Sequence, residues 1–554
     1  MVQAKTTNQQ KAADPKYRVR KDGYEWIFRP RELIIKSMTN GDIAYRSCYP
    51  IDFYWVQNSC QEKITRSAQP ILYGDQKRAQ AIPSITSILV KVANNWHPPT
   101  AEEIKKQGQK KELSKLSGIH QVDLQTLLGV ADRICVYPHE LLEIILAVAI
   151  SSQMNMQPPI WLMIIGAPSS SKTELVKLFD SLHDVFAYYV DALTENAFTS
   201  GYVPPDGSEP KDLLPLLDNK CLIVKDYTTL FSMREDTIKK ILGDLTGIFD
   251  KDFSKFSATR GNVRYSSLFS QIGCVTPAIF NKHYRYMNQL GARFLYYKIP
   301  QLTKDELNKG FAIANSSNDR EATIKAVKNI ASACFMQTVD KLPATLKNFK
   351  EKDAVTQKML QHLSVFLAKA RSLVMTQQNA FKNDKGDNVS YHEIVDKQEE
   401  QPWRALQQLT HLAKALAIAR GKDSISHQEI ATVRNVAMNS MPIDRAKVLA
   451  IFKEKTDTTS KELSNNAGID QRTAQKLLKE LLELGILDMR ADADEITGAH
   501  KGNRYFPVIE FEDILRNYNN IDVKGGTASN GPDHKNYDKI TPEMLNSSPE
   551  KILF

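Results

Sequence analysis

The pattern of hydrophobic positions changes period several times along the chain. Between residues 159 and 300, short apolar runs of strand length alternate with amphipathic runs that have the period of a helix. The apolar runs are Trp161–Ile165, Val185–Val190, Cys221–Val224, Gln271–Val275 and Leu295–Ile299. Strands that alternate with helices form parallel sheets with both faces covered. The sequence therefore predicts an α/β domain built on a parallel sheet.

The segments on either side carry other patterns. Residues 17–75 alternate like strands, and the turn Thr39-Asn40-Gly41 predicts a hairpin. Residues 303–441 have helical periods, with helix candidates that include 358–376 and 401–420. From residue 442 the order helix, helix, longer helix and two strands predicts a winged helix-turn-helix. We expect a β-rich and helical N-terminal domain at 17–120, an α/β core at 121–302, a helical lid at 303–441 and the winged helix at 442–515. The polar ends, 1–16 and 516–554, are expected to be disordered.

A loop of small residues follows the apolar run Trp161–Ile165. It comprises Gly166, Ala167, Pro168, Ser169, Ser170 and Ser171, and it leads to Lys172 and Thr173. A strand, such a loop, Lys-Thr and a helix form the phosphate-binding loop, whose backbone N–H groups point at phosphates. Lys172 can neutralise the terminal phosphates and Thr173 can hold Mg²⁺. The loop therefore predicts ATP and Mg²⁺ binding, with a chance match to a degenerate motif as the alternative. Ser171 stands where glycine is usual, and its Cβ can crowd the phosphate.

Polar residues end two further predicted strands. Asp226 follows Lys225 after the third apolar run, and Thr276 follows the fourth. Ligands of parallel sheets sit at the carboxyl ends of the strands, where Lys172 also falls. A carboxylate there can bind Mg²⁺ through water or polarise the attacking water. Nucleotidases usually have the acidic pair Asp-Glu at this position, whereas this sequence has Lys225-Asp226. Either Asp226 acts as the single acid or a second carboxylate comes from another segment. The alternative is that Asp226 is a strand-end residue without a role in catalysis.

Basic residues gather in two places that are candidates for DNA contact. They are Lys255, Arg260 and Arg264 in a turn-prone segment, and Arg472 and Lys476 off the buried stripe of the third C-terminal helix. The first group predicts contacts with phosphates. The second group is consistent with DNA binding, although winged helices also dock proteins. Aromatic residues among basic ones near the N-terminus can stack on single-stranded bases. A small β core is the favoured interpretation there, because strands use aromatic residues anyway.

Composition adds only broad limits. The 554 residues are 42% hydrophobic and 25% charged, as in globular proteins, and a net charge of +9 permits nucleic-acid binding without proving it. Six scattered cysteines without a Cys-x-x-Cys pair favour reduced structural thiols. The sequence has no apolar stretch long enough for a bilayer and no apolar signal-peptide core. We therefore expect a cytoplasmic protein without a membrane partner.

The order of these parts resembles an AAA+ ATPase, closest to the MCM-like helicases and the related ATPases of phages and mobile elements. The resemblance covers about residues 125–510, whereas residues 1–120 match no family that we can name. It rests on the loop at 166–173, Leu-Ile-Val-Lys-Asp at 222–226, Val-Thr-Pro at 275–277, Leu-Gly-Ala-Arg-Phe-Leu at 290–295 and Pro-Trp-Arg-Ala-Leu at 402–406.

The resemblance implies a role for each matching residue. Lys172 and Thr173 correspond to Walker A, and Asp226 corresponds to the Walker B acid. Thr276 corresponds to sensor 1, and Arg404 corresponds to sensor 2 on the lid. Arg293 corresponds to the arginine finger that a subunit offers to its neighbour; the alternative is a structural arginine paired with a local carboxylate. The segment 255–265 corresponds to a hairpin that grips DNA inside a ring.

We therefore expect an ATP-driven hexameric ring helicase or translocase on DNA, active in replication of a mobile element or phage. Two alternatives remain. One is a regulatory ATPase that remodels a protein, although the Gly-Ala-Phe-Thr-Gly-Ala loop of one such class is missing from the sequence. The other is an anti-phage or mobile-element ATPase whose effector is another chain.

Overall fold

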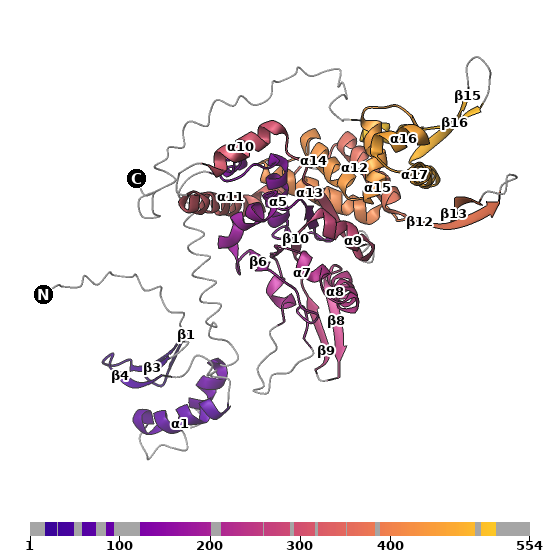
Figure 1. The fold of residues 1–554 in the computed structure, drawn as a ribbon. Coiled ribbons are helices and arrows are strands. Elements are labelled where there is room, and N and C mark those ends of the chain that lie inside the picture. The colour runs from indigo at the N-terminus through magenta and orange to yellow at the C-terminus, as the bar shows by residue number, and fades with distance from the viewer. Residues whose placement is uncertain are drawn as a thin grey trace. The chain divides into compact units, whose positions relative to one another are not determined.

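The computed structural model separates into two compact units, residues 1–112 and 113–554, which we describe individually (Figure 1). The described residues are 17–29, 32–48, 58–73, 85–92, 122–200, 212–258, 260–287, 293–315, 320–350, 352–382, 388–493 and 500–516. The expected disorder at 1–16 lies outside them, as does that at 516–554 except for Arg516, which is described. None of the described helices combines the length and hydrophobicity that crossing a bilayer requires.

The N-terminal unit is an antiparallel sheet with helices packed on one face. Its strands are β1 (Tyr17–Lys21), β2 (Tyr24–Arg29), β3 (Glu32–Ser37) and β4 (Ile43–Cys48), in the order β1-β2-β3-β4, and α1 spans Asn58–Tyr73. Gly41 has φ +76° in the turn between β3 and β4, which confirms the predicted hairpin. Trp26 and Phe28 are fully buried in a core shared with Ile64 and Leu89. Tyr45, one of the aromatic residues grouped with basic ones, belongs to the same core, which agrees with the favoured interpretation of a β core. The others of that group, Tyr49, Phe53, Tyr54 and Trp55, lie outside the described residues.

The larger unit is built on a five-stranded parallel sheet in the order β11-β5-β10-β7-β6. The strands are β5 (Trp161–Ile165), β6 (Ala187–Val190), β7 (Cys221–Val224), β10 (Ser270–Val275) and β11 (Phe294–Lys298). Side chains alternate between two buried layers: Leu162 and Ile164 belong to one, and Trp161 and Met163 belong to the other. The predicted parallel sheet, covered on both faces, is therefore confirmed.

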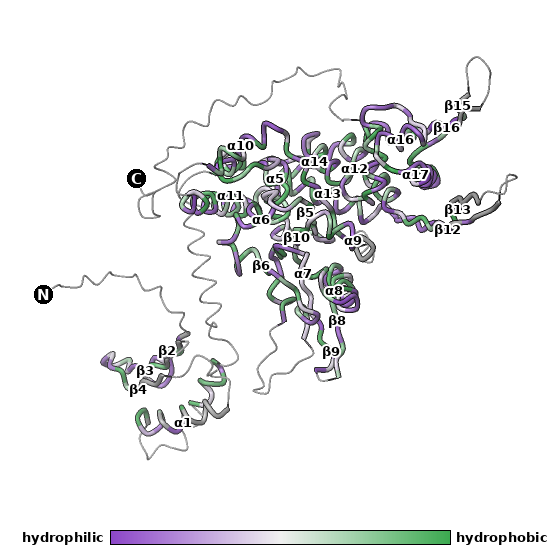
Figure 2. The backbone as a smooth tube through the Cα atoms, viewed as in Figure 1, coloured by the Kyte–Doolittle hydropathy of each residue, from purple (hydrophilic) through white to green (hydrophobic). Residues whose placement is uncertain are grey.

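Helices form the two covering layers. One face carries α4 (Leu124–Ala131), α5 (His139–Ser151), α6 (Lys172–Val176) and the 3₁₀ helix η2 (Lys177–Leu182). The other face carries η3 (Leu214–Leu217), α7 (Thr228–Phe231), α8 (Glu235–Ile248) and α9 (Pro277–Met287). Figure 2 shows hydrophobic and hydrophilic residues together within α8, as expected of a helix that covers the sheet with one side only.

The described residues of 303–441 form helices and one long antiparallel pair of strands. The helices are α10 (Lys304–Ala314), α11 (Arg320–Asn348), α12 (Ala354–Arg371), α13 (Trp403–Ala419) and α14 (His427–Asn439). Strands β12 (Leu373–Lys382) and β13 (Asn388–Gln398) pair antiparallel between α12 and α13. The predicted helix at 358–376 is therefore wrong at its end: Ser372 leaves the helical conformation with ψ 141°, and the chain turns into β12. The pairing with β13 stabilises this strand, and a helical period cannot reveal such a partner.

The C-terminal elements occur in the order that the sequence predicts. They are α15 (Ile443–Ala450), the 3₁₀ helix η5 (Ile451–Lys453), β14 (Thr458–Thr459), α16 (Ser460–Ala467), α17 (Gln471–Glu483), β15 (Leu487–Ala493), β16 (His500–Pro507) and α18 (Ile509–Leu515). Asp470 caps α17 by accepting the N–H groups of Arg472 and Thr473, and Gly485 follows that helix with φ +61°.

Two buried arginines join these C-terminal elements to the lid. The Arg445 guanidinium donates to Glu480 Oε2 on α17 at 3.1 and 3.3 Å and to the carbonyl oxygens of Ala370 and Ser372 at 3.0 and 2.6 Å. Arg434 of α14 donates to the carbonyl oxygens of Ile514 and Leu515, at the end of α18. Helix α17 therefore packs as a part of the larger unit.

Candidate phosphate-binding site

The loop after β5 begins with a glycine that no other residue can replace without rearrangement. The Gly166 N–H donates to the Val275 carbonyl oxygen at 3.1 Å, which holds the start of the loop beside β10. A Cβ added to Gly166 would lie 2.8 Å from Ile299 Cδ1 and closer still to Ser170 Oγ. The close approach of these side chains therefore explains the glycine.

Ser171, the departure from the usual glycine, adopts the backbone conformation that glycine favours. Its φ is +64° and its ψ is −2°, in the left-handed region. That conformation costs a residue with a Cβ about 1–2 kcal/mol. Ser171 Oγ donates to the Val136 carbonyl oxygen at 3.1 Å, which fastens the loop to the segment before α5. The serine therefore keeps the loop geometry of a glycine and adds one anchor.

Lys172 and Thr173 open α6, as the sequence predicts. Lys172 is buried, and its Nζ donates to the Ala167 carbonyl oxygen at 3.0 Å, across the loop. Thr173 is half-buried in the first turn. The α-helix ends at Val176 and continues as the 3₁₀ helix η2, so it is shorter than the apolar spacing suggested.

The sheet brings three predicted site residues to one edge. Strand β10 lies between β5 and β7, and all three run parallel, so the phosphate loop, Thr276 and Asp226 emerge side by side. Burial raises the pKa of the Cys274 thiol on β10 to about 12, and the charges of Lys172 and Asp226 both act on that thiol.

A second acidic residue lies near this edge, bound to Lys225. Asp226 is exposed, and its Oδ1 accepts the Thr228 N–H at 2.8 Å. Lys225 Nζ lies 2.7 Å from Oδ1 of Asp191, the residue directly after β6. The sequence analysis did not single out Asp191, although an acid that directly follows a predicted strand was a usable signal. Lys225 is therefore paired with an acid of the neighbouring strand end.

Arg293 and Arg404 lie together at the opposite edge. Arg293 directly precedes β11, whose first residue pairs with Trp161 at the start of β5. The guanidinium carbons of Arg293 and Arg404 lie 5.7 and 5.9 Å from the centroid of the same Phe249 ring. Burial and the charge of Arg404 lower the pKa of Arg293.

Two contacts hold Arg293 in place. Its carbonyl oxygen accepts the Gln408 side-chain N–H at 2.8 Å, and its Nη2 lies 3.6 Å from Asp250 Oδ2. Asp250 is therefore the local carboxylate that the alternative interpretation, a structural arginine, requires. The length of the parallel strands separates the two edges of the sheet. Arg293 and Arg404 therefore lie together at one edge, away from Lys172 of the same chain at the other.

The predicted basic hairpin exists and projects from the body of the unit (Figure 1). It consists of β8 (Asp252–Ser257) and β9 (Gly261–Ser266). Arg260 pairs with the buried carboxylate of Asp212 and donates to the Tyr265 hydroxyl at 2.9 Å. Lys255 Nζ lies 2.8 Å from Asp244. Only Arg264 of the three predicted cations is largely exposed, at 71% of its side chain, with Asp252 at 3.9 Å.

An exposed aromatic side chain accompanies Arg264 on the outer face of the hairpin. Phe256 is 78% exposed, and its cross-strand partner is Asn262. Ser254, which pairs with Arg264, faces outward as well. The sequence analysis did not single out Phe256, although its alternation with the buried Phe253 was a signal.

The two predicted cations on α17 differ in their surroundings. Arg472 is exposed in the first turn of the helix. Lys476 is half-buried, and its Nζ lies 3.9 Å from Glu480, the residue that Arg445 also binds. Both residues belong to α17, whereas the phosphate loop follows β5.

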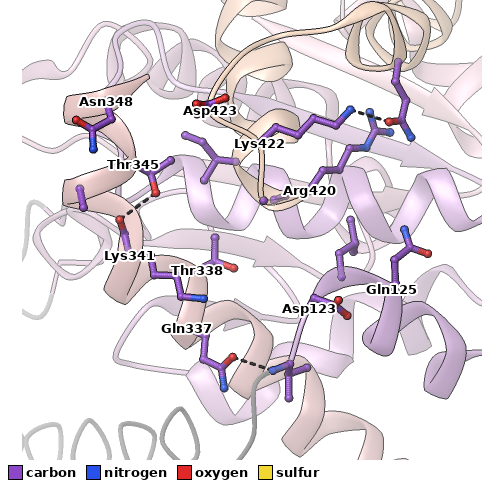
Figure 3. A pocket seen from close by; sticks show the side chains of 17 residues that line it. Asp123, Gln125, Gln337, Thr338, Lys341, Thr345, Asn348, Arg420, Lys422 and Asp423 are labelled. Carbon is purple, nitrogen blue, oxygen red and sulfur yellow. Dashed lines mark hydrogen bonds between the residues drawn. The ribbon is translucent and has the colours of Figure 1, made fainter. Parts of the chain in front are cut away.

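A separate pocket of about 690 Å³ lies between α4, α11 and the turn after α13 (Figure 3). None of the predicted site residues lines it. Arg420 at its wall pairs with Glu143 and Glu429, and Lys422 lies 2.8 Å from Glu429. The buried charges around this pocket therefore satisfy one another.

Within the described ranges, no group of three or more His, Cys, Asp or Glu residues could hold a metal ion. A cation at the phosphate loop would therefore depend on Thr173, Asp226, water and the nucleotide. No protein-family model matches the sequence, and no curated protein matches it.

Proposed function

We propose that this protein is an AAA+ ATPase with a helical lid and a C-terminal winged helix, and that it acts as a ring-shaped DNA helicase or translocase. The observation that carries the proposal is the gathering of the Gly166–Thr173 loop, Thr276 and Asp226 at the carboxyl edge of a five-stranded parallel sheet. Such an edge is where parallel sheets bind phosphorylated ligands.

The chemistry is phosphoryl transfer to water. Bound Mg²⁺ would neutralise charge on the phosphate oxygens, held by Thr173 and by Asp226 through water. Lys172 would exchange its bond to the Ala167 carbonyl for the terminal phosphates. Asp226 would orient the attacking water, and Thr276 would contact the γ-phosphate or that water. Lys225 holds Asp191, so Asp226 is the acid that we assign to the reaction.

The two arginines complete this site in a neighbouring subunit. Arg293 and Arg404 share one aromatic platform at the amino edge of the sheet, away from Lys172 of their own chain. In a head-to-tail ring this edge meets the phosphate loop of the next subunit. Arginine suits this role because its planar guanidinium offers several donors and stays charged. A homohexamer is the ring that we expect.

DNA binding would use the β8–β9 hairpin, with the exposed Arg264 against the phosphate backbone. Arg472 and Lys476 on α17 would supply a second, weaker contact. Replication of a mobile element or phage is the setting that we favour. One observation supports a different substrate: Arg260 and Lys255 are bound to Asp212 and Asp244. A hairpin with few accessible cations also fits an ATPase that remodels a protein or nucleoprotein partner.

ATP hydrolysis by the purified full chain, with and without forked DNA, tests the proposal. Lys172→Ala should abolish hydrolysis, and Asp226→Asn should keep nucleotide affinity while strongly reducing turnover. Asp226→Asn should keep the melting temperature, because Asp226 is exposed. Lys172 is buried, so the melting temperature of Lys172→Ala is measured alongside its hydrolysis to separate loss of the site from loss of the fold. Unchanged hydrolysis in Lys172→Ala would reject the site. Hydrolysis that DNA leaves unaffected would favour the remodelling ATPase.

A further inference from the structure

Lys225 lies on the face of the sheet that α6 covers. Side chains alternate along β7: Ile223 belongs to the buried layer under α6, and Val224 belongs to the opposite layer. Lys225 follows Val224 and keeps the strand pairing, because its N–H donates to the Val190 carbonyl oxygen at 3.2 Å. Its side chain therefore continues the alternation on the α6 side. It is half-buried there, with 24% of the side chain exposed.

The register places Lys225 two strands away from β5, which carries the phosphate loop. Val224 pairs with Gly273 of β10, so Lys225 is level with Cys274, and Cys274 pairs with Ile164 of β5. Neighbouring strands lie about 4.8 Å apart, so two spacings amount to about 10 Å. A triphosphate over the loop and the flexible four-carbon stem of a lysine can together span that interval. Lys225 is therefore within reach of the terminal phosphates.

Lys225 is held by a partner that a phosphate can replace. Its Nζ lies 2.7 Å from Asp191 Oδ1, and 80% of the Asp191 side chain is exposed. An ion pair with so exposed a carboxylate contributes little stability, because water screens it. Lys172 is held in a similar way, since its Nζ donates to the Ala167 carbonyl oxygen at 3.0 Å. Each lysine is thus bound to an oxygen of its own chain, which a charged phosphate oxygen can displace.

We propose that Lys225 is a second phosphate-binding lysine, which leaves Asp191 and binds the terminal phosphates of a nucleoside triphosphate together with Lys172. The proposal gives a reason for a lysine at a position where nucleotidases usually carry an acid: the ammonium group supplies a fixed positive charge beside the phosphates. Phosphate binding would then depend less on Mg²⁺ than it does at a site with two acids. The inference rests on the proposed function, because it assigns a further ligand within the same site.

The test titrates the full chain with a fluorescent, non-hydrolysable ATP analogue, once in Mg²⁺ and once in EDTA. Lys225→Met nearly keeps the length of the side chain and removes its charge. We expect the affinity to fall about 10- to 100-fold in both buffers, as for the loss of a hydrogen bond between charged groups. The matching ADP analogue should lose less, because a diphosphate offers less charge to the second lysine. Lys225→Arg should keep most of the affinity, since the charge remains.

A second variant separates a phosphate ligand from a structural ion pair. Asp191→Asn removes the partner of Lys225 and leaves its charge, so the affinity should stay at the wild-type level or rise. A structural pair predicts that both variants weaken binding alike, because both break the same contact. Asp191 is exposed, so this variant tests the proposal even if Lys225→Met loses stability. Lys240→Ala is the matched control: Lys240 pairs with Glu195 and belongs to α8, on the opposite face of the sheet.

The inference is overturned if Lys225→Met binds the ATP analogue like Lys240→Ala, or if Asp191→Asn weakens binding as much as Lys225→Met does. The proposed function fails separately, if the wild-type chain binds no analogue or if Lys172→Ala binds and hydrolyses ATP normally. Loss of binding in Lys172→Ala together with wild-type binding in Lys225→Met would reject the second lysine and leave the proposed function standing.

Discussion

Gly273 offers a sharp test of how the site is built, because one added methyl group meets a buried ring. An alanine Cβ at Gly273 would lie 2.7 Å from Tyr227 Cδ2 and closer still to Cε2, with Met163 Sδ at 3.1 Å. Ordinary contacts begin at 3.4 Å, so the ring must retreat by about 0.7 Å or more. Overpacking of this kind lowers the free energy of unfolding by about 1–3 kcal/mol. Tyr227 directly follows Asp226, so Gly273→Ala should also reduce ATP turnover.

Urea denaturation of Gly273→Ala measures that loss, and Gly243→Ala is its control. Gly243 lies in α8 with no atom near its Cβ position, so alanine there should stabilise the protein by about 0.4–1 kcal/mol. Replacing Tyr227 by leucine in the Gly273→Ala background should return part of the lost stability, since the smaller side chain leaves room. If Gly273→Ala matches the wild type while Gly243→Ala behaves as expected, Tyr227 does not pack on Gly273 and the arrangement of β7 and β10 described above is wrong.

The remaining predictions concern single side chains. Ser171→Gly should raise nucleotide affinity in a fluorescent-nucleotide titration, because it relieves the left-handed strain and removes the Cβ; a fall would mean that the hydroxyl contributes to binding. Arg264→Ala should weaken DNA binding equally for all sequences and lower the salt slope by about one unit. Arg260→Ala should cost about 1–3 kcal/mol of stability, because the buried Asp212 carboxylate loses its cation while it keeps the hydrogen bonds from the Ser200 N–H and the Tyr265 hydroxyl. A hydrogen bond to Asp132 raises the pKa of His139, so its contribution is complete below the unfolded pKa of about 6.5 and is lost as the pH rises through the folded value. His139→Gln should therefore destabilise the protein more at about pH 5.5 than at about pH 8, and equal losses at the two pH values would contradict this assignment.

The strands of the sheet could be predicted because each is a continuous apolar run. A strand buried on both faces needs apolar side chains at every position, and Trp161–Ile165 and Cys221–Val224 have them. The placement of Lys172, Thr276 and Asp226 at one edge follows from parallel strands alone. The pair of β12 and β13 was missed, since its two strands stabilise each other and carry no strong apolar run.

Contacts between distant segments could not be predicted from the sequence for similar reasons. Nothing in the pattern around Arg260 shows that Asp212 neutralises it, because the partner lies on another segment and is chosen by packing. Phe249 brings Arg293 and Arg404 together in the same way. The Lys225–Asp191 pair depends on β6 lying beside β7, and that strand order does not follow from the order of the segments in the chain.

The docking of α17 and α18 on the lid has a consequence for how the chain unfolds. Phe511 of α18 packs edge-on against Phe366 of α12, with ring centroids 5.4 Å apart, and one hydrophobic core runs from Leu124 to Leu515. The sequence predicts a domain boundary between residues 441 and 442. That boundary would cut through this hydrophobic core. Residues 122–516 should melt as one cooperative transition, and a protease acting between α14 and α15 should release no fragment that stays folded.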